Sequence, residues 1–323
     1  MLSARFCQQH SLIHDAQPSS TQMLNHCPAI SVLMPVYNAA RYLREAVESI
    51  LSQTCQDFEF LIVNDGSTDE SLQILEEYAA SDSRIRLSSR PNTGYVVALN
   101  EMLSMARGTF IARMDADDVS APERFILQLE QMQRRPNLVA LGTRYLLVDP
   151  RGRALCVHGI PLEHDEIDSQ NLRGIGAAIC HPSVMIRASA LRQVAGYRAD
   201  FWPAEDCDLF LRLAEIGEIS NLPTVGLQYR MHHASIGHTH RAVQISSACG
   251  AASAAYSRRG ILEPPVPVAP PTEASPDYRV TWAWWALRGK HLLTARRYAF
   301  AAFLRKPISL DRLRLLYCAI RGH

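Results

Sequence analysis

The sequence lacks the features that define several large protein classes. Its eight cysteines are scattered over 323 residues without a Cys-x-x-Cys pair, so neither a disulfide scaffold nor a zinc site is expected. No apolar run approaches the roughly 20 residues that span a bilayer, and a net charge of +1 gives no general reason to expect nucleic acid as a partner. The absence of Gly-x-Gly-x-x-Gly after the first expected strand and of Gly-x-x-x-x-Gly-Lys-Ser/Thr argues against a nicotinamide cofactor and a P-loop ATPase.

The composition changes along the chain and divides it into three parts. Residues 1–28 are rich in Ser, Gln and His without the apolar segment of a secretory signal, and are expected to form a disordered leader. Residues 29–240 carry the strand and helix patterns of the main folded domain. Residues 241–323 are expected to form a helical C-terminal extension, with a proline-rich linker at 264–276.

Apolar strand patterns alternate with helical patterns through the first half of the chain. Strands are expected at 30–37, 58–63, 84–87 and 108–114, with helices at 39–53, 69–80 and 95–106. Pro35 is expected to end the first strand, because proline cannot donate to a strand ladder, and Ser67 or Thr68 to cap the second helix. The alternation predicts an α/β fold with a doubly wound, mostly parallel sheet, which binds ligands at the carboxyl ends of its strands.

Three carboxylates, Asp115, Asp117 and Asp118, follow the fourth expected strand. Like charges this close repel each other unless a cation lies among them, and hard oxygen ligands suit Mg²⁺ or Mn²⁺ with a phosphate completing the shell. An isolated Asp-x-Asp can equally be a solvated acidic turn. Two more strand ends, Tyr37-Asn38 and Asn64-Asp65, are expected at the same edge of the sheet. Together the three ends offer an aromatic face, a carboxylate acceptor and a metal site, which are the parts needed to hold a base and a diphosphate.

At this point the chain resembles the family 2 inverting glycosyltransferases of GT-A fold, of the bacterial surface-polysaccharide type. The motifs that carry the resemblance are Val36-Tyr37-Asn38, Val63 to Asp69, Asn92-Thr93-Gly94, Arg113 to Asp118, His181 to Met185, Glu205 to Leu213, and Tyr229 to His232. Each motif alone is weak, but their order along residues 30–235 is specific.

The resemblance implies a nucleotide site at the strand ends. Pro35, Tyr37 and Asn38 would surround the nucleotide, with Tyr37 lying against the base. Asp65 would accept the ring N–H of the base, and Asp115 would reach the ribose or the metal shell. Many relatives have Ala-Arg-Asn where this chain has Ala98-Leu99-Asn100, which leaves open which residue contacts the nucleotide there.

The resemblance also implies a metal and an acceptor site. Asp117 and His232 would hold Mn²⁺ or Mg²⁺ on the diphosphate of the donor. Asp206 would be the catalytic base, and Glu205 would position the acceptor hydroxyl. On spacing alone, Asp206 could equally be the N-cap of the helix that follows it. Inverting transfer is one in-line displacement at the anomeric carbon, so a single base on the acceptor side is enough.

The resemblance thus predicts a metal-assisted transferase that moves a sugar, with inversion, from a UDP-linked donor to a glycan or lipid-linked acceptor in cytoplasmic assembly of cell-surface polysaccharide. Two alternatives stay open, a catalytically silent sugar-nucleotide-binding protein and a sugar-1-phosphate nucleotidyltransferase. The second would want a Gly-rich, Arg-containing loop after the first strand, where this chain has Pro35-Val36-Tyr37-Asn38. The region 149–178, which would shape the acceptor side, has no readable motif.

The C-terminal segment 277–323 is strongly basic, with ten Lys/Arg against Asp277 and Asp311. Trp282, Trp284 and Trp285 open its helical pattern. Basic amphipathic helices with tryptophans suit a membrane surface with anionic lipids, which predicts peripheral contact with the inner membrane face. Alternatively, these helices pack on the main domain and the charges form its solvated face.

Overall fold

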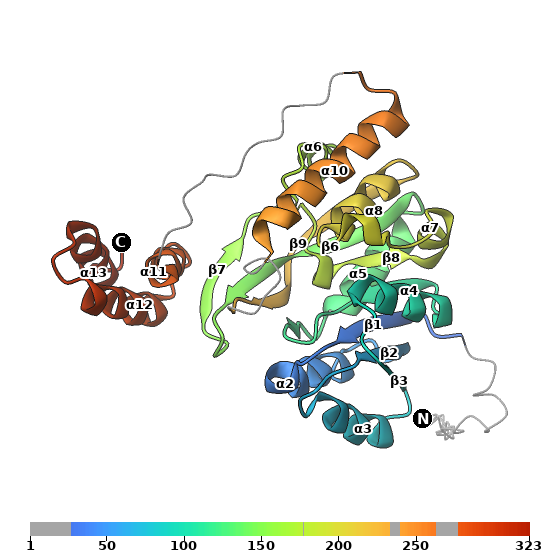
Figure 1. Ribbon diagram of the computed structural model, residues 1–323, viewed down its shortest axis with the longest axis horizontal. Helices are drawn as coiled ribbons and strands as arrows, with labels where there is room; N and C mark the ends of the chain where they lie inside the picture. The colour runs from blue at the N-terminus through green and yellow to red at the C-terminus, as the bar shows by residue number, and fades with distance from the viewer. Residues whose placement is uncertain (1–26, 177, 233–239, 263–276) are drawn as a thin grey trace, which may run out of the picture.

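The computed structural model describes residues 27–176, 178–232, 240–262 and 277–323. Within these ranges nine strands form one sheet in the order β3-β2-β1-β4-β8-β6-β9-β5, with β7 paired to β6 (Figure 1). The strands are β1 (Ile30–Val36), β2 (Phe58–Asp65), β3 (Ile85–Arg90), β4 (Phe110–Arg113), β5 (Val119–Ser120), β6 (Leu138–Val148), β7 (Ala154–His158), β8 (Met185–Arg187) and β9 (Glu218–Arg230). The linker expected at 264–276 lies outside the described residues, as does all but the end of the leader expected at 1–28.

The sheet is flanked by helices on both faces. The helices are α2 (Ala40–Leu51), α3 (Ser71–Ser81), α4 (Tyr95–Met105), α5 (Arg124–Arg134), α6 (His164–Leu172), α7 (Ala188–Gln193), α8 (Glu205–Ala214), α10 (Arg241–Arg259), α11 (Tyr278–Arg288), α12 (Leu292–Arg305) and α13 (Leu310–Arg321). Strands β3, β2, β1 and β4 pair in parallel, whereas β8 is antiparallel to both β4 and β6. The predicted α/β doubly wound sheet is confirmed.

The side chains of the central strands alternate between two apolar layers. In β1, Ile30, Val32 and Met34 belong to the layer that contains the buried faces of α2 and α3, whereas Leu33 belongs to the layer of α4 and α8. A strand points successive side chains to opposite faces of its sheet. Because both faces are covered, a strand here needs apolar residues at every position, which explains the uninterrupted apolar runs in the sequence.

The prediction that Pro35 ends the first strand is wrong. Pro35 lies inside β1, paired in register with Val63 of β2. On its other side β1 pairs with β4 only as far as Leu33, opposite Arg113. Pro35 therefore sits where β1 has a neighbour on one side alone, and its missing N–H costs no ladder bond on the open side.

The loops after β1 and β2 are tied together by side chains, and this changes the predicted cap of α3. Ser67 Oγ accepts the backbone N–H of Asn38 at 3.0 Å, and the Thr68 N–H donates to Asn38 Oδ1 at 2.7 Å. Neither residue caps α3. Instead Asp69 Oδ1 accepts the N–H of Ser71 at 3.0 Å, a short-range bond typical of Asp before a helix.

The C-terminal helices pack on the main domain. Trp282 of α11 is 3% exposed and belongs to the same apolar cluster as Leu155 of β7. Tyr298 of α12 donates its hydroxyl to Asp149 Oδ2 at 2.7 Å, at the end of β6. At Gly289 a Cβ would lie 2.4 Å from the carbonyl oxygen of Leu155, so only glycine fits this approach. Trp282 is therefore used in packing on the main domain, and the contact of segment 277–323 with a membrane stays a prediction.

Helix α10 also packs on the main domain. Its alanines Ala248, Ala251 and Ala255 form a small apolar cluster with Cys207 and Leu211 of α8. Small side chains let two helices approach closely, which fits the alanine-rich pattern of this segment.

The division into a domain at 29–240 and an extension at 241–323 stays a prediction. No helix in the described ranges combines the length and the apolarity that crossing a bilayer requires.

The packing of the tail predicts a contrast between two aromatic residues. Trp282→Ala removes a buried side chain and is expected to lower the free energy of unfolding by about 3–5 kcal/mol. Phe300→Ala, at a residue that is 54% exposed, should change it by no more than about 0.5 kcal/mol. Urea unfolding of the full chain followed by circular dichroism measures both, and equal losses would contradict the observed packing of α11.

Candidate active site

The strand ends named from the sequence meet at one edge of the sheet. Tyr37 follows β1 with 54% of its surface exposed, Asp65 is the last residue of β2, and Asp115 follows β4. His232, two residues after β9, reaches the same edge, where its Nε2 lies 2.7 Å from Asp117 Oδ2. The structure thus brings the predicted nucleotide residues and the two predicted metal ligands to neighbouring strand ends.

The acidic cluster consists of Asp115, Asp117 and Asp118, each with a carboxylate oxygen within 4.8 Å of the others. Asp115 forms an ion pair with the buried Arg113. Burial raises the pKa of Asp115 against the lowering effect of Arg113, and burial with the charge of Asp117 raises the pKa of Asp118 well above its usual range. Asp118 Oδ2 is buried and accepts no hydrogen bond from the described residues. Crowded oxygens with an unsatisfied acceptor fit a divalent cation.

Arg230 ties β9 to the acidic loop. Its backbone N–H donates to Asp118 Oδ1 and its Nε to the main-chain oxygen of Asp117, both at 2.8 Å. Its Nη2 pairs with Glu45 of α2 at 2.5 Å, and its guanidinium carbon lies 4.7 Å from the ring centroid of Tyr42. Arg230 is 3% exposed, and these contacts hold the loop of Asp117 and Asp118 against α2. Asp118 therefore anchors the end of β9.

Asp65 organises the loop between β3 and α4. Its Oδ1 accepts the N–H of Thr93 at 3.0 Å and pairs with Arg90 Nη1 at 2.7 Å, and its Oδ2 accepts the N–H of Gly94 at 2.9 Å. A carboxylate offers about four lone-pair positions. Three are filled by described residues, so among these residues Oδ2 of Asp65 has one acceptor position without a donor.

The acceptor-side acids begin helix α8. Glu205 is the first residue of α8 and Asp206 the second, so both lie at the positive end of the helix dipole. Burial, with the charge of Asp206 as the next cause, raises the pKa of Glu205 to about 8, and burial also raises the pKa of Asp206. Asp206 Oδ1 accepts the N–H of Cys207 at 2.8 Å, whereas Glu205 Oε2 is buried and accepts no bond within the described chain. The sequence alternative of a structural N-cap is weakened, because no side-chain bond caps α8.

The sequence did not predict the roles of two arginines. Arg113 is 3% exposed and pairs with Asp115, and its charge acts on the carboxyls of Asp115, Glu205 and Asp206. Arg90 pairs with both Asp65 and Glu101, at 2.7 Å each, and so links the end of β2 to α4. An arginine inside an apolar strand just before an acidic motif was the available signal for Arg113.

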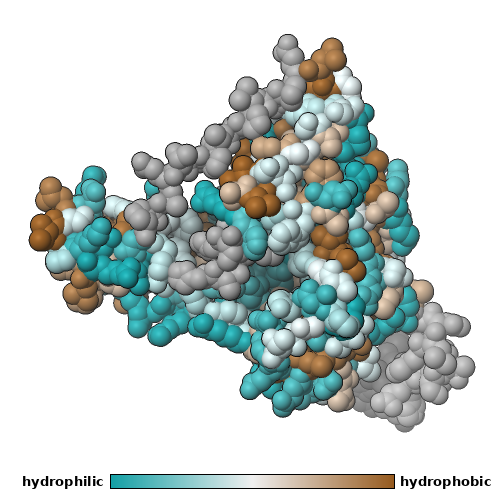
Figure 2. All heavy atoms as spheres, in the orientation of Figure 1, coloured by the Kyte–Doolittle hydropathy of each residue, from teal (hydrophilic) through white to brown (hydrophobic). Residues whose placement is uncertain are grey.

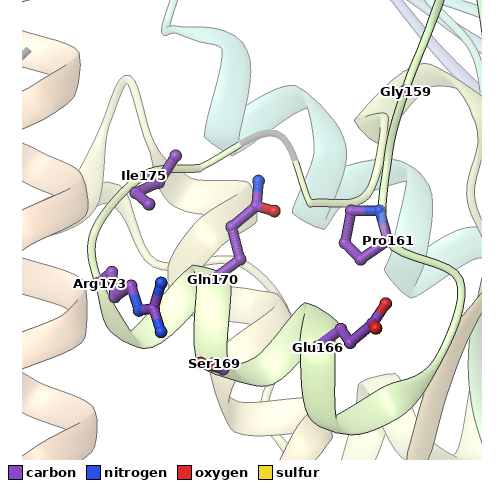
Figure 3. A pocket seen from close by; sticks show the side chains of 7 residues that line it. All are labelled: Gly159, Pro161, Glu166, Ser169, Gln170, Arg173 and Ile175. Atoms are coloured by element: carbon purple, nitrogen blue, oxygen red, sulfur yellow. The ribbon is translucent and has the colours of Figure 1, made fainter.

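A hollow of about 480 Å³ lies away from these acids, between α6 and the segments on either side of it (Figure 3). Its lining consists of Gly159, Pro161, Glu166, Ser169, Gln170, Arg173 and Ile175. Gln170 Nε2 donates to the carbonyl of Gly176 at 3.0 Å, which closes one side of it. None of the acids described above lines this hollow, so it is separate from the strand-end site.

The fold and the site define an inverting glycosyltransferase with a GT-A fold. A family model described as "Glycosyl transferase family 2" matches residues 31–194, just over half of the chain, and the chain belongs to this family. "Putative glycosyltransferase EpsE" of Bacillus subtilis is 37% identical over 198 residues, 60% of this chain and 69% of that protein. "O-antigen biosynthesis glycosyltransferase WbnJ" of Escherichia coli is 32% identical over 210 residues, 64% of this chain and 81% of that protein.

Solved structures support the same fold. TarS 1–349 of S. aureus in complex with UDP-GlcNAc superposes with a TM-score of 0.53 at 18% identity, covering 90% of this chain and 79% of that one. The mannosyltransferase PcManGT of Pyrobaculum calidifontis, in complex with GDP-Man and Mn²⁺, gives a TM-score of 0.52 at 16% identity and covers 88% of each chain. The family consists of transferases that use nucleotide sugars, which leaves the nucleotidyltransferase alternative without support.

The environment of Glu205 predicts a pH-dependent stability. Its pKa of about 8 in the folded protein lies above the ordinary value of 4.5, so between these pH values the folded state binds more protons than the unfolded state. Stability therefore falls as pH rises from about 4.5 to 8. Glu205→Gln, which mimics the neutral acid, should make this decline shallower, and the part that remains comes from Asp115, Asp118 and Asp206, whose pKa values are also raised. Thermal unfolding across this pH range measures the difference, and parallel curves for both proteins would refute it.

Proposed function

We propose that this protein transfers a sugar, with inversion, from a UDP-linked donor to a hydroxyl of a glycan or lipid-linked acceptor. One observation carries the proposal: the charge of a single buried guanidinium acts on the acids of the donor edge and on the acids of α8. Arg113 pairs with Asp115, and its charge acts to lower the pKa of Asp118, in the loop after β4, and of Glu205 and Asp206 at the start of α8. This shared influence supports a site in which the two sets of acids serve the two partners of a single displacement.

The donor base would lie between Tyr37 and Asp65. The half-exposed ring of Tyr37 offers a stacking surface, and Pro35 and Asn38 frame it at the end of β1. The acceptor position left on Asp65 needs a ring N–H. Uracil and guanine carry such a group, whereas neutral cytosine and adenine offer no ring N–H to this position. TarS holds UDP-GlcNAc and PcManGT holds GDP-Man in similar folds, and UDP is the nucleotide proposed here.

The diphosphate would be held at the acidic cluster. Asp117 and His232 would hold Mn²⁺ or Mg²⁺, and Asp115, fixed by Arg113, would reach the metal shell or the ribose. The metal, when bound, neutralises the charge that develops on the leaving diphosphate. His232 also stacks near Tyr42, with ring centroids 5.4 Å apart, which fixes its orientation toward Asp117. These contacts preorganise the ligands before the donor arrives.

The acceptor hydroxyl would be activated by Asp206. The proton of the acceptor hydroxyl would pass to the Asp206 carboxylate while the hydroxyl oxygen forms a bond to the anomeric carbon. The bond from that carbon to the diphosphate oxygen would break on the opposite face. Glu205, with a pKa of about 8, is protonated at neutral pH and can position the acceptor through hydrogen bonds without competing for the proton. Asp208, which is fully buried and pairs with Arg212 at 2.6 Å, is a structural acid in the same turn.

The acceptor is proposed to be a growing cell-surface polysaccharide on the cytoplasmic side of the membrane. A similar protein is named for O-antigen biosynthesis, and the match covers most of its length. The metal, the donor and the acceptor are separate parts of this proposal, and each can be tested alone.

Asp117→Ala tests the metal site. The variant should lose the rise in melting temperature that UDP and Mn²⁺ together give the wild type, because a ligand stabilises only a protein that binds it. Glu130→Ala, at an exposed acid on α5, is the matched control and should behave as the wild type. Wild-type turnover of the Asp117 variant with Mn²⁺ or Mg²⁺ supplied would show that the metal assignment is wrong.

Asp206→Asn tests the base. The change keeps the shape of the side chain and removes the proton acceptor, so kcat should fall about 10²-fold or more while the affinity for the donor stays near normal. Donor transfer in the presence of a panel of glycan acceptors measures kcat, and calorimetric titration with UDP measures affinity. A parallel loss of donor affinity would instead indicate a structural role for Asp206.

A further inference from the structure

The outer surface of the C-terminal helices carries large apolar side chains exposed to solvent. Ile308 is 93% exposed and Leu310 is 83% exposed, at the turn between α12 and α13. The other members are Leu293, Phe300, Leu304, Leu313, Tyr317 and Ile320. Figure 2 shows hydrophobic side chains gathered at the end of the molecule formed by these helices. These eight residues are called the outer face below.

The outer face follows the helical period on both helices. On α12 the exposed apolar residues are spaced by seven and then four positions, and on α13 by three, four and three. Such spacing keeps a set of side chains on one side of a helix. The opposite sides of both helices supply buried residues, among them Ala299 and Leu315, that pack into the main core. One side of α12 and α13 therefore packs on the rest of the protein, and the other side is exposed to solvent.

Cations without acidic partners lie among these apolar residues. Within the described ranges no ion pair or hydrogen bond involves the side chains of Arg297, Arg305, Lys306 and Arg314, all of which are exposed. The acid Asp277 pairs with Arg279 and Arg312. The surface of α12 and α13 thus combines apolar side chains with four cations that pair with no acid of the described residues, against one exposed acid, Asp311.

We propose that the outer face docks on the surface of a bilayer that contains anionic lipids. Lipid headgroups supply the negative charge that four unpaired cations require, and the acyl boundary accepts side chains such as Ile308. A second copy of the chain fits less well, because a twofold contact would set this surface against itself and bring like charges together. Trp282 takes no part, since it is buried against the main domain.

The docking follows from the tail alone and does not rest on the proposed donor or base. Because α11 and α12 pack on β7, docking through α12 and α13 would hold the whole protein at the surface. The bound state should weaken with salt, since the screening length falls from about 10 Å at 0.1 M to about 3 Å at 1 M.

Flotation of the full chain with vesicles tests the proposal. The protein should float with vesicles of phosphatidylcholine and phosphatidylglycerol at low salt, should stay in the aqueous fraction with phosphatidylcholine alone, and should be released near 1 M salt. If it stays in the aqueous fraction with the anionic vesicles at low salt, or floats equally with neutral ones, the proposal is overturned.

Paired variants locate the contact. Lys306→Glu with Arg314→Glu should reduce partitioning about 25-fold or more, since each cation near an anionic surface contributes about fivefold. Arg134→Glu with Arg192→Glu, at exposed cations elsewhere, is the matched control. Ile308→Ser with Leu310→Ser should also weaken binding, while Leu262→Ser, at a residue 95% exposed just after α10 and outside the outer face, should not.

Melting temperature with UDP and Mn²⁺ checks that each variant is folded. Outer-face variants that float as their controls do would overturn the proposal. Sedimentation velocity supplies a further check. If the wild type self-associates and Ile308→Ser with Leu310→Ser abolishes this association, the outer face binds a second copy and the membrane proposal is overturned.

Discussion

A buried positive charge at the end of β4 is the constraint on which the site depends. Arg113, which is 3% exposed, pairs with Asp115, and its charge also acts on the carboxyl of Glu205 from a distant part of the chain. Desolvation lowers the pKa of a buried guanidinium, but the charge of Asp115 offsets this and the net shift is upward. Acids gathered this closely would protonate or move apart without a fixed cation. Arg113 thus offsets the negative charge that gathers after β4 and acts on the acids at the start of α8.

Much of the fold was predictable from the sequence because local patterns agree with it. The apolar runs of β1 and β2 and the spacing in α2 reflect burial on two faces, and burial leaves a periodic trace in sequence. Pro35 was misplaced because the cost of a proline depends on how far the neighbouring strand extends, which is a property of the sheet. The cap of α3 was misplaced because Asn38, from another loop, takes the hydrogen bonds of Ser67 and Thr68.

The site was predicted for residues that lie in short motifs and missed for those whose partners are distant. The motifs placed Asp65, Asp117 and His232 at one edge, and the structure brings the last two within 2.7 Å. The bonds of Arg230 to Asp117 and Asp118 join residues more than 110 positions apart, which no local pattern encodes. The high pKa of Glu205 is likewise a result of tertiary burial.

The bond between Tyr298 and Asp149 has a consequence for folding. Asp149 is fully buried at the end of β6, and one of the groups that satisfy its charge arrives 149 residues later in the chain. A contact of such sequence separation forms late, because a long loop must close first. During synthesis, the carboxylate of Asp149 would therefore stay incompletely satisfied until the last helices are made. The final step of folding would be the packing of α11 and α12 on the hairpin of β6 and β7.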